Sequence, residues 1–274
     1  MKRINELHNT YLNKEIWIAG SGPSLSTYPD DFFENKIGIT LHMAYLKFPT
    51  TTFMYANEPD RVKYLKKTYP SFYKIKHIYG IPFHDISKRE SYELISDLCN
   101  VYTFWRRPYP PKGIRGKIDW TFTSKKVKQA RAGKGTVFGG HGTCLHGALY
   151  AAIMLGGNPI NLIGTGHGMY KGSEHFSDVL EIDKGMRPNA PSFSDPNNNV
   201  PMIEQTIAII EACKNMGIKI NWIKEYSNTA NYEKHHISRE GLEKMKLQYT
   251  RKFTVTKRIK NSIKQLYNPM INSL

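Results

Sequence analysis

The sequence lacks the features that mark zinc-stapled, secreted and membrane-spanning proteins. Its three cysteines, Cys99, Cys144 and Cys213, are far apart and form no Cys-x-x-Cys pair, so a cysteine zinc site is not expected. A sparse, odd cysteine count is typical of a reducing compartment. No apolar run approaches the ~18 residues of a spanning helix, and residues 1–16 carry no signal-like apolar stretch. We expect a cytoplasmic protein.

Acidic residues are scarce as well. The chain has 23 acidic and 39 basic side chains, for a formal net charge of +16. Such an excess favours anionic partners, which include nucleic acid, acidic lipid headgroups and phosphorylated or carboxylated small molecules. A basic solubility surface explains the same charge equally well. With 274 residues, 40% of them hydrophobic, the chain has enough material for one large domain or a domain with an insertion.

Short apolar segments alternate with helical patterns along the chain. Strands are expected at 16–19, 37–41, 52–55, 76–79, 160–163 and 218–223, and helices from about residue 58, at 143–155 and at 202–216. This alternation predicts an α/β fold, a doubly wound, mostly parallel Rossmann-like sheet with helices on both faces. The 143–155 helix has small or apolar residues nearly all round, which predicts that it is buried.

We expect residues 1–228 to form one Rossmann-like domain. Within it, the stretch 102–135 has no clean period and is predicted to be an irregular insertion or lid, and 183–201 to be a loop. Residues 229–274 form a basic C-terminal tail, with no acidic residue from Lys244 onward. Basic and apolar residues alternate there, which predicts an amphipathic helix that docks on an anionic membrane or is simply solvated.

The turn after the first strand is the clearest candidate for ligand binding. It reads Gly20, Ser21, Gly22, Pro23, Ser24. Glycines permit close approach of a ligand to the backbone, proline is favoured in a first helical turn, and the free N–H groups there can bind phosphate. Leu25 stands where a dinucleotide fingerprint would have its third glycine. A plain strand-to-helix turn is the alternative.

Three further segments should reach the same carboxyl edge of the sheet, where open α/β sheets bind ligands. Asn57 and Glu58 follow a strand and can bond a ribose hydroxyl or a base, or else cap the next helix. The Gly139–Thr143 loop, with Gly142 and Thr143, and the loop from Gly164 would complete the pocket. On the latter loop, His167 and His175 are candidates for a general base or phosphate contact.

Two other parts of the sequence contain side chains that can take part in binding or catalysis. His146 lies within a buried helix and is predicted to be a satisfied core residue, and no histidine spacing indicates a metal site. Arg106 and Arg107, within a basic and aromatic stretch, are candidates to clamp an acceptor or a leaving phosphate. Basic residues interleaved with aromatics also suit single-stranded nucleic acid, and a solvated cationic loop is the third interpretation.

These motifs together resemble two related groups: the 6-hydroxymethylpterin diphosphokinase MptE-like proteins and the bacterial CMP-sialic-acid sialyltransferases of glycosyltransferase family 42. Both begin with a strand and a Gly-x-Gly-Pro-Ser-Leu turn, and both have a later Leu-Gly-x-x-x-Ile-x-Leu-x-Gly strand, here 155–164. His175 matches an MptE-like histidine, whereas Gly166 replaces the aspartate of that group. Tyr170 matches one sialyltransferase tyrosine, and residues 194–199 contain no counterpart of the sialyltransferase catalytic histidine.

The resemblance implies a nucleotide-dependent transferase, first of all a glycosyltransferase with a CMP-sugar-like donor and an unknown acceptor. His175, His167 or Tyr170 would then act on the leaving phosphate or the acceptor hydroxyl. The alternative is an ATP-dependent diphosphokinase, which needs Mg²⁺ and would draw on Glu58 and Asp60 for carboxylate ligands. A third interpretation is a nucleic-acid-binding or assembly protein that keeps only the scaffold.

Overall fold

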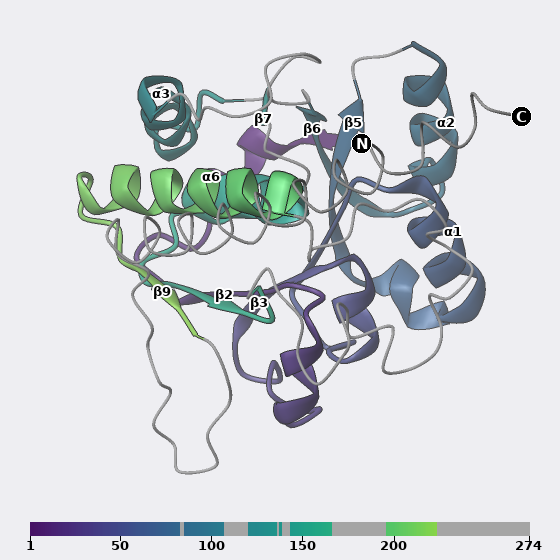
Figure 1. The fold of residues 1–274 in the computed structure, drawn as a ribbon. Coiled ribbons are helices and arrows are strands. Elements are labelled where there is room, and N and C mark those ends of the chain that lie inside the picture. The colour runs from purple at the N-terminus through teal and green to yellow at the C-terminus, as the bar shows by residue number, and fades with distance from the viewer. Residues whose placement is uncertain (83–84, 107–119, 136, 139–142, 166–195, 224–274) are drawn as a thin grey trace, which may run out of the picture.

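The structure is a computed structural model that describes residues 1–82, 85–106, 120–135, 137–138, 143–165 and 196–223. Its centre is a nine-stranded sheet (Figure 1), in which every strand pair is parallel. The strands are β1 (Lys2–Arg3), β2 (Ile16–Ala19), β3 (Ile37–Leu41), β4 (Phe53–Ala56), β5 (Lys76–Pro82), β6 (Asn100–Arg106), β7 (Val137–Phe138), β8 (Ile160–Ile163) and β9 (Ile220–Trp222). The α/β fold with a parallel sheet is therefore confirmed.

The order of the strands reverses at β2. From β2 the chain steps outward through β3, β4, β5 and β6, and it then returns to place β8 and β9 on the other side of β2. The pair β2–β8 is thus the topological switch point of the sheet. In open α/β sheets the crevice outside the carboxyl ends of the strands at such a point is the usual ligand site.

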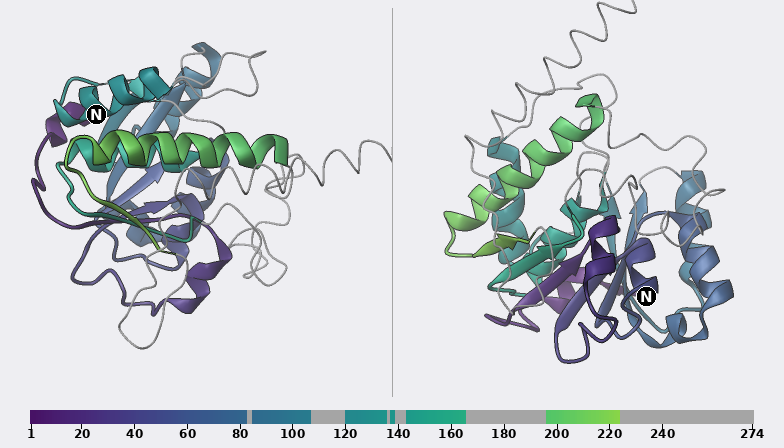
Figure 2. Two further views of the ribbon diagram at one scale, coloured as in Figure 1. Left: turned by 60° about the vertical axis from the view of Figure 1, so that its left-hand side comes forward. Right: turned by 60° about the horizontal axis from the view of Figure 1, so that its bottom comes forward.

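Helices cover both faces of the sheet. The α-helices are α1 (Pro59–Thr68), α2 (Asp85–Ile95), α3 (Trp120–Arg131), α4 (Cys144–Met154) and α6 (Pro196–Lys214), and the 3₁₀ helices are η1 (Ile4–Leu7), η2 (Pro23–Thr27), η3 (His42–Leu46) and η4 (Pro70–Lys74). One face carries α4 with α3 and α6, which pack against each other, and α1 and α2 lie on the opposite side (Figures 1 and 2).

Strand side chains alternate between these two layers, as the pleat requires. Ile16 and Ile18 of β2 join the core under α4, whereas Trp17 and Ala19 join a second cluster under η2. Because both faces of the parallel strands are buried, the strands read as continuous apolar runs in the sequence. This explains why the bounds predicted for β3 and β8 match the structure.

The helix α4 is the buried helix that the sequence predicts. Every residue from Leu145 to Met154 is buried. Its N-cap is Thr143, whose hydroxyl oxygen accepts a hydrogen bond from the Leu145 N–H at 3.2 Å. The chain leaves the helix through Gly156, at φ +89°, a left-handed conformation that glycine adopts without strain.

Two sequence predictions are corrected by the structure. The stretch 102–135 was predicted to be an irregular lid, but its first part belongs to β6 and its last part forms α3. The loop predicted over 183–201 gives way to α6 at Pro196. The predicted tail, 229–274, lies outside the described residues. Among the described residues, no helix combines the length and apolar character needed to cross a bilayer.

Candidate functional site

The candidate site lies at the carboxyl edge of the sheet, where β2, β3, β4 and β8 end. The register pairs Leu41 of β3 with Tyr55 of β4 and Ala19 of β2 with Ile163 of β8, so these strands end at nearly the same level. The residues just beyond them therefore face the same space. The N-terminus of α4 lies close by, because α4 packs on β2, β3 and β4.

At the switch point, the glycines of the predicted phosphate turn serve to pack two backbones together. The N–H of Gly22 donates to the carbonyl oxygen of Gly164 at 2.8 Å, and the N–H of Gly20 donates to that of Ile163 at 2.8 Å. A β-carbon on Gly22 would lie 2.5 Å from the Gly164 oxygen, and one on Gly20 would lie 2.7 Å from Cγ2 of Thr165. Packing alone thus requires both glycines, whatever binds nearby.

The segment that follows this turn is shorter than an α-helix. Pro23 occupies the first helical position as predicted, but η2 is a five-residue 3₁₀ helix. Few peptide dipoles are aligned in so short an element, so the positive helix end expected beside Ser24 is weak. Ser21 and Ser24 are partly buried. An anion at this edge would gain more from the eleven-residue α4.

His42 follows β3 directly and has an uncommon backbone conformation. Its φ is +45°, a left-handed value that costs energy in a residue with a β-carbon. The residue is 4% exposed, and its Nε2 accepts a hydrogen bond from the backbone N–H of Asn57 at 3.1 Å. Residues held in strained conformations by surrounding contacts cluster at active sites and ligand-binding sites.

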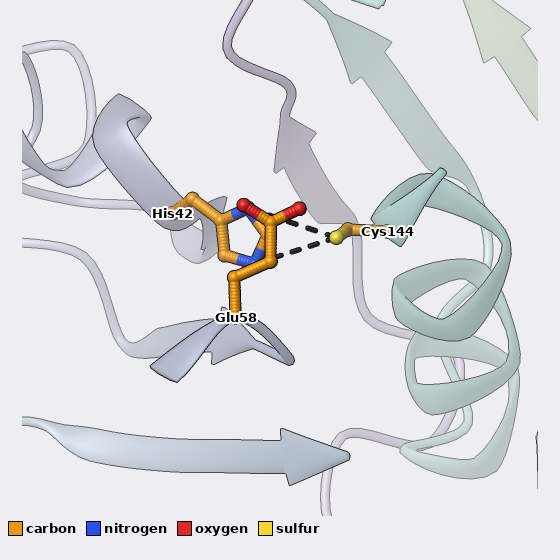
Figure 3. Close-up of side chains that lie close together, drawn as sticks. All are labelled: His42, Glu58 and Cys144. Atoms are coloured by element: carbon orange, nitrogen blue, oxygen red, sulfur yellow. Dashed lines mark hydrogen bonds and ion pairs between the residues drawn. The ribbon is translucent and has the colours of Figure 1, made fainter. Parts of the chain in front are cut away.

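Cys144 is the first residue of α4 and reaches the same point. Its half-buried thiol donates to Oδ1 of Asn57 at 2.8 Å. The sulfur also lies 3.3 Å from Nε2 and 3.6 Å from Nδ1 of His42 (Figure 3). Asn57, which is 7% exposed, is therefore held through its backbone by His42 and through its amide by Cys144.

An ion pair between a buried arginine and a half-exposed glutamate completes the cluster. Nε of Arg61 donates to Oε2 of Glu58 at 2.7 Å, and the Arg61 side chain is 4% exposed while that of Glu58 is 48% exposed. The same carboxylate oxygen lies 3.9 Å from Nδ1 of His42. The Glu58 carboxylate is thus anchored from behind by a guanidinium and keeps one side open to solvent.

His42, Glu58 and Cys144 have the composition of a zinc site, but their hydrogen bonds do not suit one. One ligand atom from each lies within 4.8 Å of the others, and zinc accepts this donor set. However, Nε2 of His42 accepts the Asn57 N–H, which places the proton of a neutral imidazole on Nδ1. Neither ring nitrogen then offers a lone pair to a metal ion.

The same residues do not form a nucleophilic dyad either. A thiol that passes its proton to Nε2 must lie along the lone pair in the ring plane, and it would then be about 5 Å from Nδ1. The observed distances of 3.3 and 3.6 Å to the two nitrogens place the sulfur against the Nδ1–Nε2 side of the ring. The thiol proton is directed at Asn57 instead.

The structure brings together part of the predicted site. Asn57 lies at the N-terminus of α4, beside the residue that follows Thr143, and Gly20, Gly22 and Gly164 meet at the neighbouring switch point. Arg106 ends β6, and its side chain is not among those described. The remaining candidates, Gly142, His167, Tyr170, His175 and Arg107, lie outside the described residues.

Three residues of this site, His42, Arg61 and Cys144, were not predicted from the sequence. A signal was present for His42, because it follows the Ile37–Leu41 strand as Asn57 follows β4. The prediction that His146 is a core residue is confirmed: it is fully buried, with Nε2 3.1 Å from the Met202 carbonyl oxygen and 3.0 Å from the Thr206 hydroxyl.

Comparisons with known proteins add no assignment. No family model matches the chain, and no curated protein matches it. The resemblance to the MptE-like and sialyltransferase groups therefore stays a prediction from the sequence. The fold and the geometry of the carboxyl edge are the basis for a functional proposal.

Proposed function

We propose that the protein is a nucleotide-dependent transferase, of the glycosyltransferase type, that binds its donor nucleotide at the carboxyl edge between the β2–β8 switch point and the N-terminus of α4. One observation carries the proposal: the reversal of strand order at β2, which puts the Gly20–Ser24 turn, Asn57 and α4 at one edge of a parallel sheet. Open α/β sheets bind nucleotides at such a reversal.

Two chemical features at this edge suit a nucleotide. The N-terminus of α4 directs the positive end of an eleven-residue helix toward the edge, which favours a phosphate. The half-exposed Glu58 carboxylate and the Asn57 amide are groups that bond ribose hydroxyls and base edges. The phosphate and the nucleoside would thus contact different parts of the same cluster.

The transfer step needs positioning and charge neutralisation more than covalent help from the protein. The basic surplus of the chain suits a leaving nucleotide phosphate. His175, His167 and Tyr170 remain the candidates to act on that phosphate or on the acceptor hydroxyl. In the sequence they follow β8, whose carboxyl end lies beside the proposed nucleotide site.

The described carboxylates favour glycosyl transfer over the Mg²⁺-dependent diphosphokinase. Glu58 is paired with Arg61 at 2.7 Å, and a guanidinium competes with Mg²⁺ for the same oxygen. Asp60 has an 83% exposed side chain and lies 3.8 Å from Lys63. Neither arrangement is a preformed magnesium site, since Mg²⁺ prefers carboxylates that converge with the substrate phosphates.

The test is calorimetry and thermal unfolding with nucleotides and nucleotide sugars, followed by detection of nucleotide release with candidate acceptors. A nucleotide at 100 times its Kd should add about 2.7 kcal/mol to the free energy of unfolding. Asn57→Ala should weaken binding about tenfold, whereas Asn35→Ala, at an exposed position, should leave it unchanged. If no nucleotide or nucleotide sugar binds the wild-type protein, the proposal fails.

A second function, binding of an anionic polymer, is favoured by a groove of about 680 Å³ between α3 and α6. Trp120 and the lysines Lys125, Lys128 and Lys134 line it, with Glu211 among them. The aromatic ring and the cations are the groups that bind single-stranded RNA.

A salt series with single-stranded RNA tests this function. Lys125→Gln with Lys128→Gln should reduce the slope of log K against log salt by about 1.4. The matched control is Lys63→Gln with Lys67→Gln on the exposed side of α1. If both double variants reduce the slope equally, the groove has no special role and the net charge alone explains binding.

A further inference from the structure

The groove between α3 and α6 is an open hollow lined by side chains of both helices. Nε2 of Gln205 in α6 donates to the Thr123 hydroxyl of α3 at 3.0 Å. Burial raises the pKa of the Cys213 thiol in α6 to about 12, and the charge of Arg131 in α3 opposes this effect. The two contacts join positions with the same offset, so the helices run in the same direction and positions along them can be matched.

One acidic side chain lies among the basic residues of this groove. The matching places Glu211 of α6 level with Gln129 of α3, with Lys125 and Lys128 before it along the groove and Lys134 beyond the end of α3. Glu211 is half-buried. In the part of the chain that the structure describes, neither Glu211 nor any of these three lysines forms an ion pair.

A carboxylate does not suit a site that binds phosphate groups alone. It repels them, and it can only accept hydrogen bonds. A ligand that fits both the lysines and Glu211 therefore combines negative charge with hydrogen-bond donors. Single-stranded RNA does so where its bases carry amino groups: adenine and cytosine each present an N–H₂ donor, whereas uracil, like thymine, has a carbonyl oxygen at that place.

We propose that Glu211 is a specificity-determining residue of the α3–α6 groove, which accepts a hydrogen bond from a base amino group and makes the groove prefer adenine and cytosine over uracil. The lysines attract the phosphates, and the Trp120 ring contacts a base. Ala208 and Ala212, beside Glu211 on α6, leave room for a flat base. This inference rests on the second proposed function, RNA binding in the groove, and adds which bases the groove selects.

The experiment compares cytosine with uracil, because the two rings have the same size. Fluorescence anisotropy at low salt measures binding of short labelled oligocytidine and oligouridine RNA to the full-length protein, Glu211→Gln and Glu34→Gln. The wild type should bind oligocytidine about tenfold more tightly. In Glu211→Gln this preference should fall to about twofold or less, mainly because oligouridine binds more tightly, since a glutamine amide can donate to the uracil carbonyl.

Glu34→Gln is the matched control, because it removes the same charge at an exposed position outside the groove and should keep the preference. Thermal unfolding shows that each variant is folded. If the wild type binds both RNAs equally, or if Glu211→Gln keeps the full preference, this inference is wrong while RNA binding in the groove stands. If the wild type binds neither RNA, or if Lys125→Gln with Lys128→Gln binds as the wild type does, RNA binding in the groove has itself failed.

Discussion

The two ends of the carboxyl edge are built in opposite ways. At the β2–β8 end, Gly20 and Gly22 meet Gly164 backbone to backbone, with no side chain between them. At the β3–β4 end, His42, Asn57 and Cys144 meet through side chains drawn from three elements. The motif most visible in the sequence is thus required for packing, and the side-chain cluster at the other end is assembled from residues scattered along the chain.

The largest effect should come from the glycine contact. We expect Gly22→Ala to destabilise the protein by about 3 kcal/mol or more, because the new methyl group would lie 2.5 Å from the Gly164 carbonyl oxygen and backbone must move. Gly217→Ala is the control: its φ is +71° but nothing lies within 4 Å, so only about 1 kcal/mol of backbone strain is expected. Equal losses in urea unfolding would contradict the packing explanation.

His77 in β5 lies away from both ends of the carboxyl edge and makes the stability of the protein depend on pH. Burial, together with a smaller contribution from Lys66, lowers the pKa of His77 to about 4, even though the hydrogen bond to the Phe72 carbonyl oxygen acts in the opposite direction. The unfolded chain, with an ordinary pKa of 6.5, binds more protons between these values. The free energy of unfolding is therefore highest above pH 6.5, and it falls by about 3 kcal/mol as the pH approaches 4.

The measurement for His77 is urea unfolding at a series of pH values. His77→Gln keeps a donor for the Phe72 carbonyl and removes the titrating group, so most of the decline between pH 6.5 and 4 should disappear. An unchanged decline in this variant would assign the pH dependence to other groups.

At the β3–β4 end, His42→Ala should destabilise the protein by about 2 kcal/mol, because the buried Asn57 N–H loses its acceptor. His42→Asn should cost less, since asparagine tolerates the left-handed backbone at φ +45°. Urea unfolding compares the two variants. Equal losses of unfolding free energy in the two variants would show that the left-handed backbone at position 42 does not determine the cost of the substitution.

The smallest expected effect is at the helix that closes the edge. Thr143→Ala removes the side-chain acceptor of the Leu145 N–H and should cost about 1 kcal/mol. Thr143→Ser keeps the hydroxyl and should lie within a few tenths of the wild type, as measured by urea unfolding. A serine variant as unstable as the alanine variant would mean that the methyl group, and not the cap, matters.

The sequence predicted the strands that are buried on both faces, and it did not predict the unevenly buried α3. The strands β2, β3 and β8 are short apolar runs followed by polar or glycine residues, so their bounds could be predicted. In α3 the buried positions are Thr123, Val127 and Ala130, and the lysine and other polar side chains between them hide the apolar stripe.

Only those site residues that directly follow a predicted strand could be placed from the sequence. Asn57 could be placed at the edge because β4 ends just before it. The partnership of Cys144 with His42 and Asn57 joins positions about 100 residues apart, and no local pattern reports such a contact. It depends on how α4 packs across β3 and β4, which is a property of the folded chain.

The outer side of β6 has a consequence for handling the protein. On one side β6 pairs with β5. On the other side it pairs with two short strands, β1 along its first half and β7 along its second. Without them, a seven-residue strand would present unpaired N–H and carbonyl groups, which is a template for aggregation. Removing residues 1–3, or attaching a bulky tag directly to them, is therefore expected to promote edge-to-edge association between molecules.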